Sequence, residues 1–242
     1  MLNLIKADLY KTFHRMYLYV LMAVMSGLAI LFNVVVALNG AGRAEGFGSI
    51  LSLLVIPLLI MAVFADIITS EENKEHTLKN TVAFGVSRSK LYLARNVSSI
   101  LVATLAAAVT LISFFGSGFL LLRQGNGPSM LPEHFVLKIA VAFLIYLTGV
   151  VIATFLATVV KKNTMFAFSY YMVLFVPVLL CQLLSYASRI FTKVGDVMLL
   201  SRINMLAQAT PAQMMTTVWI ALIHIAVFVA LGLTLFKKQE IN

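Results

Sequence analysis

The residues of this sequence that could take part in chemistry are concentrated in one polar stretch, residues 70–90, called the polar segment below. Six of the nine residues from Glu71 to Lys79 are charged or histidine, whereas long apolar runs lie on both sides. Carboxylates, lysines and a histidine at this density suit contact with water or with a charged surface. The polar segment is therefore where this chain is expected to communicate with the aqueous phase.

Asp66 and His224 lie inside apolar runs, where ionisable residues are functional candidates because an apolar medium penalises charge. Asp66 lies one turn before the end of the second run, and His224 lies within the last one. Asp66 suits a gate or a solute pathway, and the alternative is a carboxylate that reaches interfacial water. His224 suits a proton site, and the alternative is a neutral ring bonded to a neighbouring carbonyl. The Glu133–His134 pair and the single Cys181 do not make a metal-ligand set, so no metal or catalytic site is predicted.

The composition indicates a protein that uses lipid as its solvent. Of its 242 residues, 61% are hydrophobic and 11% are charged, and the mean hydropathy is +0.99. Soluble domains carry about 25% charged residues, so this chain could not cover a globule with polar groups. The formal net charge of +9 comes from basic residues at the ends of the apolar runs, which is typical of membrane topology and contact with membrane lipids rather than of nucleic-acid binding.

Six apolar runs are each near the roughly 20 residues that a helix needs to cross the hydrocarbon. They predict membrane-spanning helices at residues 17–38, 50–69, 91–122, 135–160, 164–187 and 217–236. A Gly-rich loop follows the first run, and the third run is long enough to tilt or to project into the cytoplasm. Residues 188–216 indicate a mixed loop in which 197–206 could form a short surface helix. The predicted fold class is all-α, a polytopic membrane protein with one transmembrane domain over residues 1–242.

Residues 2–16 precede the first span and have a basic amphipathic pattern. Leu9 and Phe13 fall on an apolar helical face, whereas Lys6, Lys11 and Arg15 fall largely on the other. This pattern predicts a helix that lies in the headgroup plane of the bilayer. The alternative is a cytoplasmic extension of the first span.

Capping patterns predict how the polar segment begins. Thr69 and Glu72 have the spacing of a capping box, in which a threonine caps a helix and an acidic residue three positions later bonds back to it. Glu75 and Lys79 are four residues apart, in the order that favours an ion pair on a helix. A short helix is therefore predicted to start after Thr69.

The rest of the polar segment predicts a turn into the next span. Leu78 and Val82 would share one face of the short helix, Gly85 would end it, and Ser87 would cap the following helix. The expected order is a short helix, a glycine turn and a helix that enters the membrane. On these patterns alone, a docking element and an ordered loop both remain open.

The basic residues predict the orientation in the membrane. With the N-terminus inside, the inner segments hold twelve Lys and Arg residues and the outer segments hold six. Because Lys and Arg are enriched in cytoplasmic loops, both termini and the polar segment are expected in the cytoplasm.

The polar segment also resembles a family pattern. It reads E-x-x-x-x-T-L-K-N-x-x-x-x-G-x-S-R-x-K from Glu72 to Lys90, after the second span and downstream of a basic amphipathic start. This arrangement resembles the permeases of the ABC type-2 exporter (ABC-2-type) family, and most closely the short bacterial six-span permeases of antibiotic-peptide and bacteriocin export or immunity systems. His76 stands where many relatives have a glycine.

The resemblance implies a division of labour between subunits. The polar segment would be the coupling helix that docks on a separate cytoplasmic ATPase, and residues 2–16 would be the interfacial helix. The residues matched to the coupling role are Glu71, Glu72, Glu75, His76, Thr77, Leu78, Lys79, Val82, Gly85, Ser87 and Arg88. A second permease copy or a paralogue would complete the transmembrane path in the bacterial cell membrane. ATP and Mg would bind to the partner, since this chain has no P-loop motif and is not expected to be an enzyme itself.

The expected cargo is hydrophobic or amphiphilic, such as a peptide antibiotic, a bacteriocin, a drug or a lipid-like compound. Two other classes compete with this interpretation. A secondary transporter or channel would need intramembrane ionisable groups, for which Asp66 and His224 are the candidates. An intramembrane enzyme would need a catalytic cluster at membrane depth, which the sequence does not suggest.

Overall fold

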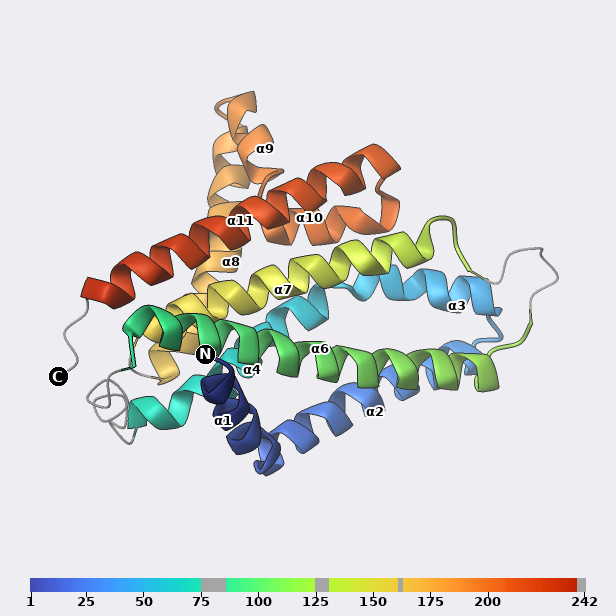
Figure 1. Cartoon of the computed structure of the whole chain (residues 1–242). Coiled ribbons are helices and arrows are strands. Elements are labelled where there is room, and N and C mark those ends of the chain that lie inside the picture. Colours follow the sequence, from blue (N-terminus) through green and yellow to red (C-terminus); the bar gives the residue numbers. More distant parts are fainter. Residues whose placement is uncertain (75–85, 125–130, 161–162, 239–242) are drawn as a thin grey trace.

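The structure is a computed structural model that describes residues 1–74, 86–124, 131–160 and 163–238 (Figure 1). Within these ranges the regular structure is helical, apart from an isolated bridge between Gly42 and Arg123. The helices are α1 (Leu2–Phe13), α2 (Met16–Leu38), α3 (Arg43–Ser49), η1 (Ile50–Leu53), α4 (Val55–Lys74), α6 (Arg88–Leu121), α7 (Phe135–Val159), α8 (Asn163–Ser185), α9 (Arg189–Gly195), α10 (Leu199–Met205), η2 (Leu206–Gln208) and α11 (Pro211–Lys238). The predicted all-α class is confirmed.

Five of the described helices are long and apolar enough to cross a membrane, namely α2, α6, α7, α8 and α11. A sixth candidate span is a pair of helices, residues 43–53 and 55–69, in which the chain bends by 55° between the two halves. The multi-pass helical architecture expected from the apolar runs is therefore confirmed. The predicted second span corresponds to the bent pair.

The region before the second span is helical, although its glycines predicted a loop. Glu45 accepts a hydrogen bond from the backbone N–H of Gly42 at 3.4 Å, which caps the start of α3. Phe47 is fully buried and packs against the rings of Phe114, Phe115, Phe119 and Phe135. This aromatic packing holds α3 against α6 and α7, so tertiary contacts outweigh the low helix propensity of glycine.

The bend itself lies just before Pro57. A proline ring clashes with the carbonyl four residues earlier, here that of Leu53, so one helix cannot run unbroken through this point. In α4 the proline occupies the first turn, where its missing N–H costs nothing. The Tyr146 hydroxyl donates to the carbonyl of Leu54 at 2.8 Å, which ties α7 to the residue directly before α4.

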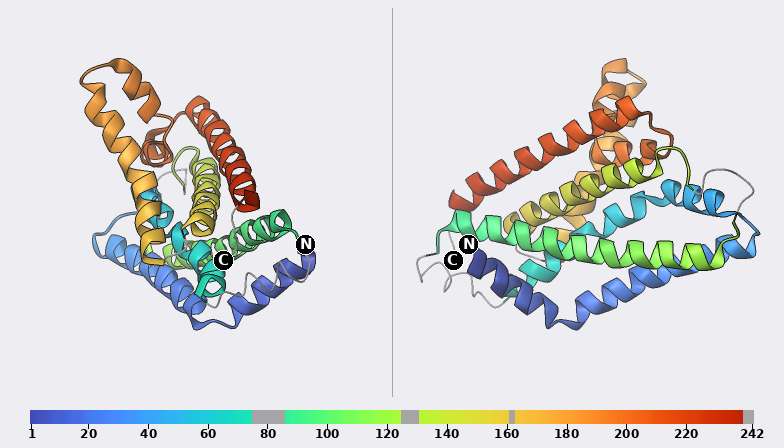
Figure 2. Two further views of the ribbon diagram at one scale, coloured as in Figure 1. Left: turned by 90° about the vertical axis from the view of Figure 1, so that its left-hand side faces the viewer. Right: turned by 45° about the vertical axis from the view of Figure 1, so that its right-hand side comes forward.

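Helix α7 is the centre of the bundle, and most of its length is buried. It packs against α4 and α11, as Figures 1 and 2 show. A Cβ atom at Gly149 would lie 2.9 Å from Leu58 Cδ1 and 3.0 Å from the Tyr170 hydroxyl, so the glycine permits this close approach. Tyr170 in turn donates to the carbonyl of Leu58 at 2.8 Å, which joins α8 to α4.

Helix α6 is the longest element, with 34 residues. At 1.5 Å per residue it is about 51 Å long, well beyond the roughly 30 Å of a bilayer core. Helix α2 lies along it, and Asn33 donates to the carbonyl of Phe114 at 2.7 Å and to the Ser117 hydroxyl at 2.8 Å. The prediction that the third span exceeds the bilayer thickness is confirmed by this length.

Helix α8 runs steeply across the other long helices and rises away from the bundle (Figure 2). It is held by one buried stripe, in which Phe166, Tyr170, Leu174 and Val178 repeat every four residues. Its second half leaves large apolar residues such as Leu179 and Leu183 exposed. This exposure fits a helix surrounded by lipid or by a further subunit.

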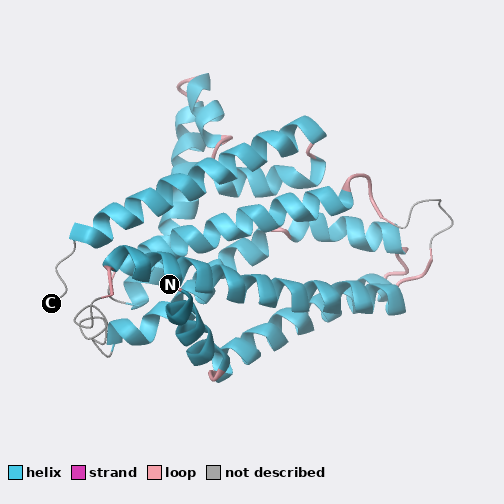
Figure 3. Ribbon diagram, viewed as in Figure 1, coloured by secondary structure: helices cyan, strands magenta, loops and turns pink. Residues whose placement is uncertain are grey.

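The connection between α8 and α11 is mostly helical, whereas the sequence predicted a mixed loop at 188–216 (Figure 3). The expected helix within 197–206 exists as α10, but it is not a surface helix, because Leu199, Leu200 and Ile203 are buried. Helix α11 begins at Pro211 rather than at 217, and it exposes Trp219, the single tryptophan of the sequence. Helix α10 is buried because it packs against α4, α7 and α8.

Candidate functional site

The candidate site is the end of the bundle where α4 ends at Lys74, α6 begins at Arg88 and α11 ends; it is called the polar end below (Figure 1). Glu71 and Glu72 belong to the last turns of α4. The remaining predicted coupling residues, Glu75, His76, Thr77, Leu78, Lys79, Val82 and Gly85, lie outside the described residues. The expected ion pair, apolar face and glycine stop in that stretch therefore stay predictions.

The predicted capping box at Thr69 is wrong. Helix α4 runs without interruption from Val55 to Lys74, so Thr69 lies inside it rather than at a helix start. Its hydroxyl donates to the carbonyl of Ala65 at 2.7 Å, one turn back in the same helix. Helix α4 continues past Thr69 because residues 70–74 include two glutamates and a lysine, which are good helix formers, and no glycine or proline.

The start of α6 is tied to the end of α11. Ser87 occupies the N-cap position with extended backbone, as predicted, but its side chain makes no capping hydrogen bond. Arg88 Nη1 donates to the carbonyl of Lys237 at 3.1 Å, where a positive charge is favoured by the helix dipole. One turn further along α6, the Tyr92 hydroxyl donates to the carbonyl of Phe228 at 3.3 Å. These bonds join residues about 140 positions apart in sequence, 149 in one pair and 136 in the other.

The N-terminal helix is confirmed, but it is shorter than predicted. Helix α1 ends at Phe13 and α2 begins at Met16, so Arg15 lies in the bend between them. Lys6 and Lys11 are exposed, as the basic face requires, and Leu9 packs against the core. Phe13, predicted on the apolar face, is exposed.

Arg15 has a different role from the one expected of a headgroup-facing cation. Its Nη1 atom donates to the carbonyl of Ile67 in α4, so the guanidinium turns toward the protein. On the same side of α1, Thr12 is buried at 1% exposure, and Asp8 accepts a hydrogen bond from Ser98 of α6 at 3.2 Å. Helix α1 is therefore fastened to α6 through Asp8, and the bend that follows it is fastened to α4 through Arg15.

Four adjacent polar residues on α6 were missed by the sequence reasoning. Arg95, Asn96, Ser98 and Ser99 are all buried, and Arg95 is only 1% exposed. A buried guanidinium is costly unless it is paired, and neither Arg95 nor Asp8 is without a partner. The signal was available, because an R-N-x-S-S run inside an apolar span marks a polar face that needs a polar neighbour.

Asp66 and His224 belong to separate places. Asp66 is half-buried in α4, one residue before the Ile67 carbonyl that Arg15 reaches, and it is not without a partner. His224 Nδ1 lies 2.8 Å from the carbonyl oxygen of Ile220, the arrangement expected for a ring bonded to its own helix. His224 lines a pocket between α7, α8, α10 and α11 to which Asp66 does not contribute. The structure therefore does not join the two into one proton path.

The described polar end is held together by hydrogen bonds between separate parts of the chain. Arg88 and Tyr92 connect α6 to α11, Ser98 connects α6 to α1, and Arg15 connects the bend after α1 to α4. Among the described residues, no group of three or more His, Cys, Asp or Glu side chains could hold a metal ion.

No family model and no curated protein matches the sequence. The family suggested by the polar segment consequently rests on residues 70–90 themselves. What the described structure adds is the geometry that surrounds this segment.

Proposed function

We propose that this chain is the membrane-spanning permease subunit of an ATP-driven ABC exporter in a bacterial cell membrane. Separate cytoplasmic ATPase subunits dock on the polar segment, and a second permease copy or a paralogue completes the path. The cargo is a hydrophobic or amphiphilic compound. In this proposal both termini lie in the cytoplasm, the side favoured by the excess of basic residues.

The observation that supports this proposal most is the connection of α1, α4, α6 and α11 at the polar end. A coupling element must transfer the movement of a soluble motor to spanning helices, which calls for stiff links between distant parts of the chain. Arg88 links α6 to α11, and Arg15 links the α1–α2 bend to α4, in each case through a backbone carbonyl. The polar segment connects α4 directly to α6, so its position at this junction suits force transfer.

The test is co-purification of an affinity-tagged chain from its native host in mild detergent. The proposal expects a stoichiometric P-loop ATPase whose ATPase activity is stimulated by the permease. Glu72→Lys combined with Glu75→Lys should abolish that association, because reversing two charges on a docking surface replaces attraction by repulsion. The matched control is Glu133→Lys, at an exposed side chain outside the polar segment, which should leave the complex intact.

Two results would contradict the proposal. One is unchanged co-purification and stimulation in the charge-reversed variant, which would remove the polar segment from the docking site. The other is a clean oligomer that moves solute in liposomes without any ATPase. That outcome would favour the secondary transporter or channel instead.

A further inference from the structure

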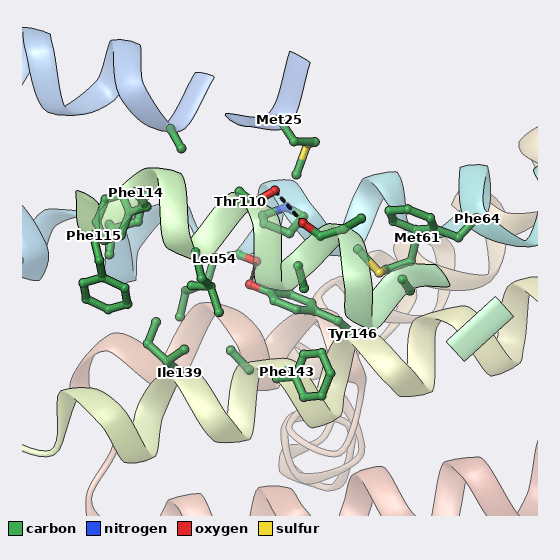
Figure 4. Close-up of a pocket in the computed structure, with 18 residues that line it drawn as sticks. Met25, Leu54, Met61, Phe64, Thr110, Phe114, Phe115, Ile139, Phe143 and Tyr146 are labelled. Atoms are coloured by element: carbon green, nitrogen blue, oxygen red, sulfur yellow. Dashed lines mark hydrogen bonds between the residues drawn. The ribbon is translucent and has the colours of Figure 1, made fainter. Parts of the chain in front are cut away.

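An elongated apolar pocket lies between α2, α4, α6 and α7, and it is called the slot below (Figure 4). Its empty space, counted out to its open mouth, is about 870 Å³. Five alanines contribute to the lining where larger apolar side chains would fill the space, and these are Ala29, Ala103, Ala106, Ala107 and Ala142. The room in the slot therefore comes from small side chains on three of its four walls.

The slot is lined almost entirely by apolar side chains. Among the described residues that line it, Thr110 and Tyr146 carry hydroxyl groups, and both of these already donate to backbone carbonyls. Thr110 donates its hydroxyl proton to the carbonyl of Ala106 at 2.8 Å, and Tyr146 donates to Leu54, as the dashed lines in Figure 4 mark. A polar ligand would lose its hydrogen bonds to water without replacement, so the slot selects for an apolar occupant.

The slot has the length of one membrane leaflet. On α6 its lining runs along one helical face from Ala103 to Phe115. Twelve residues at 1.5 Å each make about 18 Å, compared with roughly 15 Å for half of a bilayer core. An extended alkyl chain from a single leaflet matches this length.

The volume of the slot suits an alkyl chain better than a protein helix. A helix about 10 Å across and 18 Å long would occupy roughly 1,400 Å³, and an alkyl chain with carbon contacts near 4 Å needs on the order of 300 Å³ over the same length. The empty space of the slot, with its open mouth included, exceeds the volume of the chain and falls short of that of the helix.

The slot has a deep wall and a half-buried rim. The deep wall is made of buried residues such as Ala106 and Phe114, which are 2% and 4% exposed. The half-buried lining residues come from α2 as well as from α6 and α7, and they include Met25, Ala107 and Phe143. All three helices are candidate membrane spans, so the slot lies between segments that the hydrocarbon of a bilayer would surround.

We propose that the slot binds an alkyl chain of a membrane phospholipid, which enters sideways from the bilayer while its headgroup stays outside. An apolar cavity of this kind does not hold water, and hydrocarbon from the adjoining bilayer fills it. This inference goes beyond the proposed export function and does not depend on an ATPase partner. The polar segment has no part in it.

The test uses the purified chain in vesicles of phosphatidylcholine that carries a photoreactive diazirine in one acyl chain. After irradiation, adducts are mapped to residues by peptide mass spectrometry. The proposal expects adducts on the buried wall, at Ala106 and Phe114, as well as on outward-facing residues such as Ile112, which is 73% exposed. Labelling of Ile112 alone would overturn it, because bulk lipid reaches that side chain without entering the slot.

A pair of neighbouring substitutions on α6 provides the matched control. Ala107→Trp fills the slot and should reduce labelling of Ala106 and Phe114 several-fold, with Ile112 unchanged. Ala108→Trp adds the same ring at an exposed position that does not line the slot, and it should leave the adduct map as it was. Equal maps for the two variants would contradict the proposal. The wild-type map tests it even if one variant fails to fold.

A second experiment tests whether the alkyl chain in the slot comes from a bilayer phospholipid or from a free amphiphile. A diazirine-bearing fatty alcohol is added to vesicles of unlabelled phosphatidylcholine. An excess of the phospholipid should suppress its labelling of Ala106. Labelling of the buried wall by the alcohol alone, with none by the phospholipid probe, would overturn the assignment to membrane lipid.

Discussion

At Gly232 the missing side chain lets α11 lie directly against the Tyr92 ring of α6. A Cβ atom there would overlap the ring, and Tyr92 is fully buried next to Phe236. The same tyrosine donates to the carbonyl of Phe228, so one residue of α6 both packs on α11 and bonds to it. Glycine at this position is a condition for the junction at the polar end.

Gly232→Ala should therefore destabilise the protein. Overpacking of this kind typically lowers the free energy of unfolding by about 1–3 kcal/mol. This loss exceeds the stabilisation that alanine provides through its higher helix propensity. The cost should appear as a lower melting temperature in detergent, and most of it should disappear when Tyr92→Leu is also present. Gly27→Ala is the control, because nothing lies within 4 Å of a Cβ atom at that site. Equal melting temperatures for Gly232→Ala and Gly27→Ala would show that the contact with Tyr92 is not limiting.

The broken second span shows how one element depends on a side chain from another. Pro57 favours the bend of the helix pair, and Leu54 lies at that bend. Tyr146 of α7 donates its hydroxyl proton to the carbonyl of Leu54, and both residues line the slot. This hydrogen bond therefore holds two walls of the slot together at the bend.

Tyr146→Phe should lower the stability of the protein. Removing the hydroxyl deletes one hydrogen bond between α7 and the bend, at a cost of about 0.5–1.5 kcal/mol, while the ring keeps its packing. Thermal unfolding in detergent measures the loss. Tyr171→Phe is the comparison, since its bond to the Leu59 carbonyl is longer, at 3.3 Å, and its side chain is 39% exposed. A larger loss for Tyr171→Phe than for Tyr146→Phe would contradict the role given to Tyr146.

The long apolar elements could be predicted from the sequence, because twenty consecutive apolar residues leave few alternatives to a spanning helix. The short ones could not, since α3 and α10 owe their structure to tertiary packing around Phe47 and Leu200. At Thr69 the capping pattern was present but was outweighed by helix continuity.

The sequence also contains a clear signal for the start of α11, which the sequence analysis did not use. Thr210 and Gln213 form the reciprocal capping box of α11, with bonds of 2.9 and 3.4 Å, and Pro211 stands at the first helical position. For the candidate site, the sequence marked the polar segment and the basic character of α1. The links from Arg88 and Arg15 to distant carbonyls depend on the folded arrangement, which spacing does not reveal.

Over the whole molecule, the ends of α4 and α11 and the start of α6 lie together, and the turns after α2 and α6 lie at the opposite end (Figure 1). This arrangement places Lys74 and Arg88, on either side of the undescribed part of the polar segment, at the same end of the bundle as the last residues of α11. If that end is cytoplasmic, residue 76 is accessible only from inside the cell.

The orientation can be checked by cysteine labelling in intact cells. In a Cys181→Ala background, His76→Cys should react with a membrane-impermeant maleimide only after the membrane is opened. Glu133→Cys, at an 88% exposed side chain before α7, should react from outside. The reverse pattern would invert the membrane topology.

The single tryptophan gives this protein a fluorescence probe that needs no engineering. Trp219 is 61% exposed in the N-terminal half of α11, the helix whose other end is bonded to Arg88. Indole emission depends on the polarity around the ring, so the spectrum of the unmodified protein reports the surroundings of α11 alone. Any movement that begins at the polar end and shifts α11 along the bilayer normal would change the emission wavelength of the native chain.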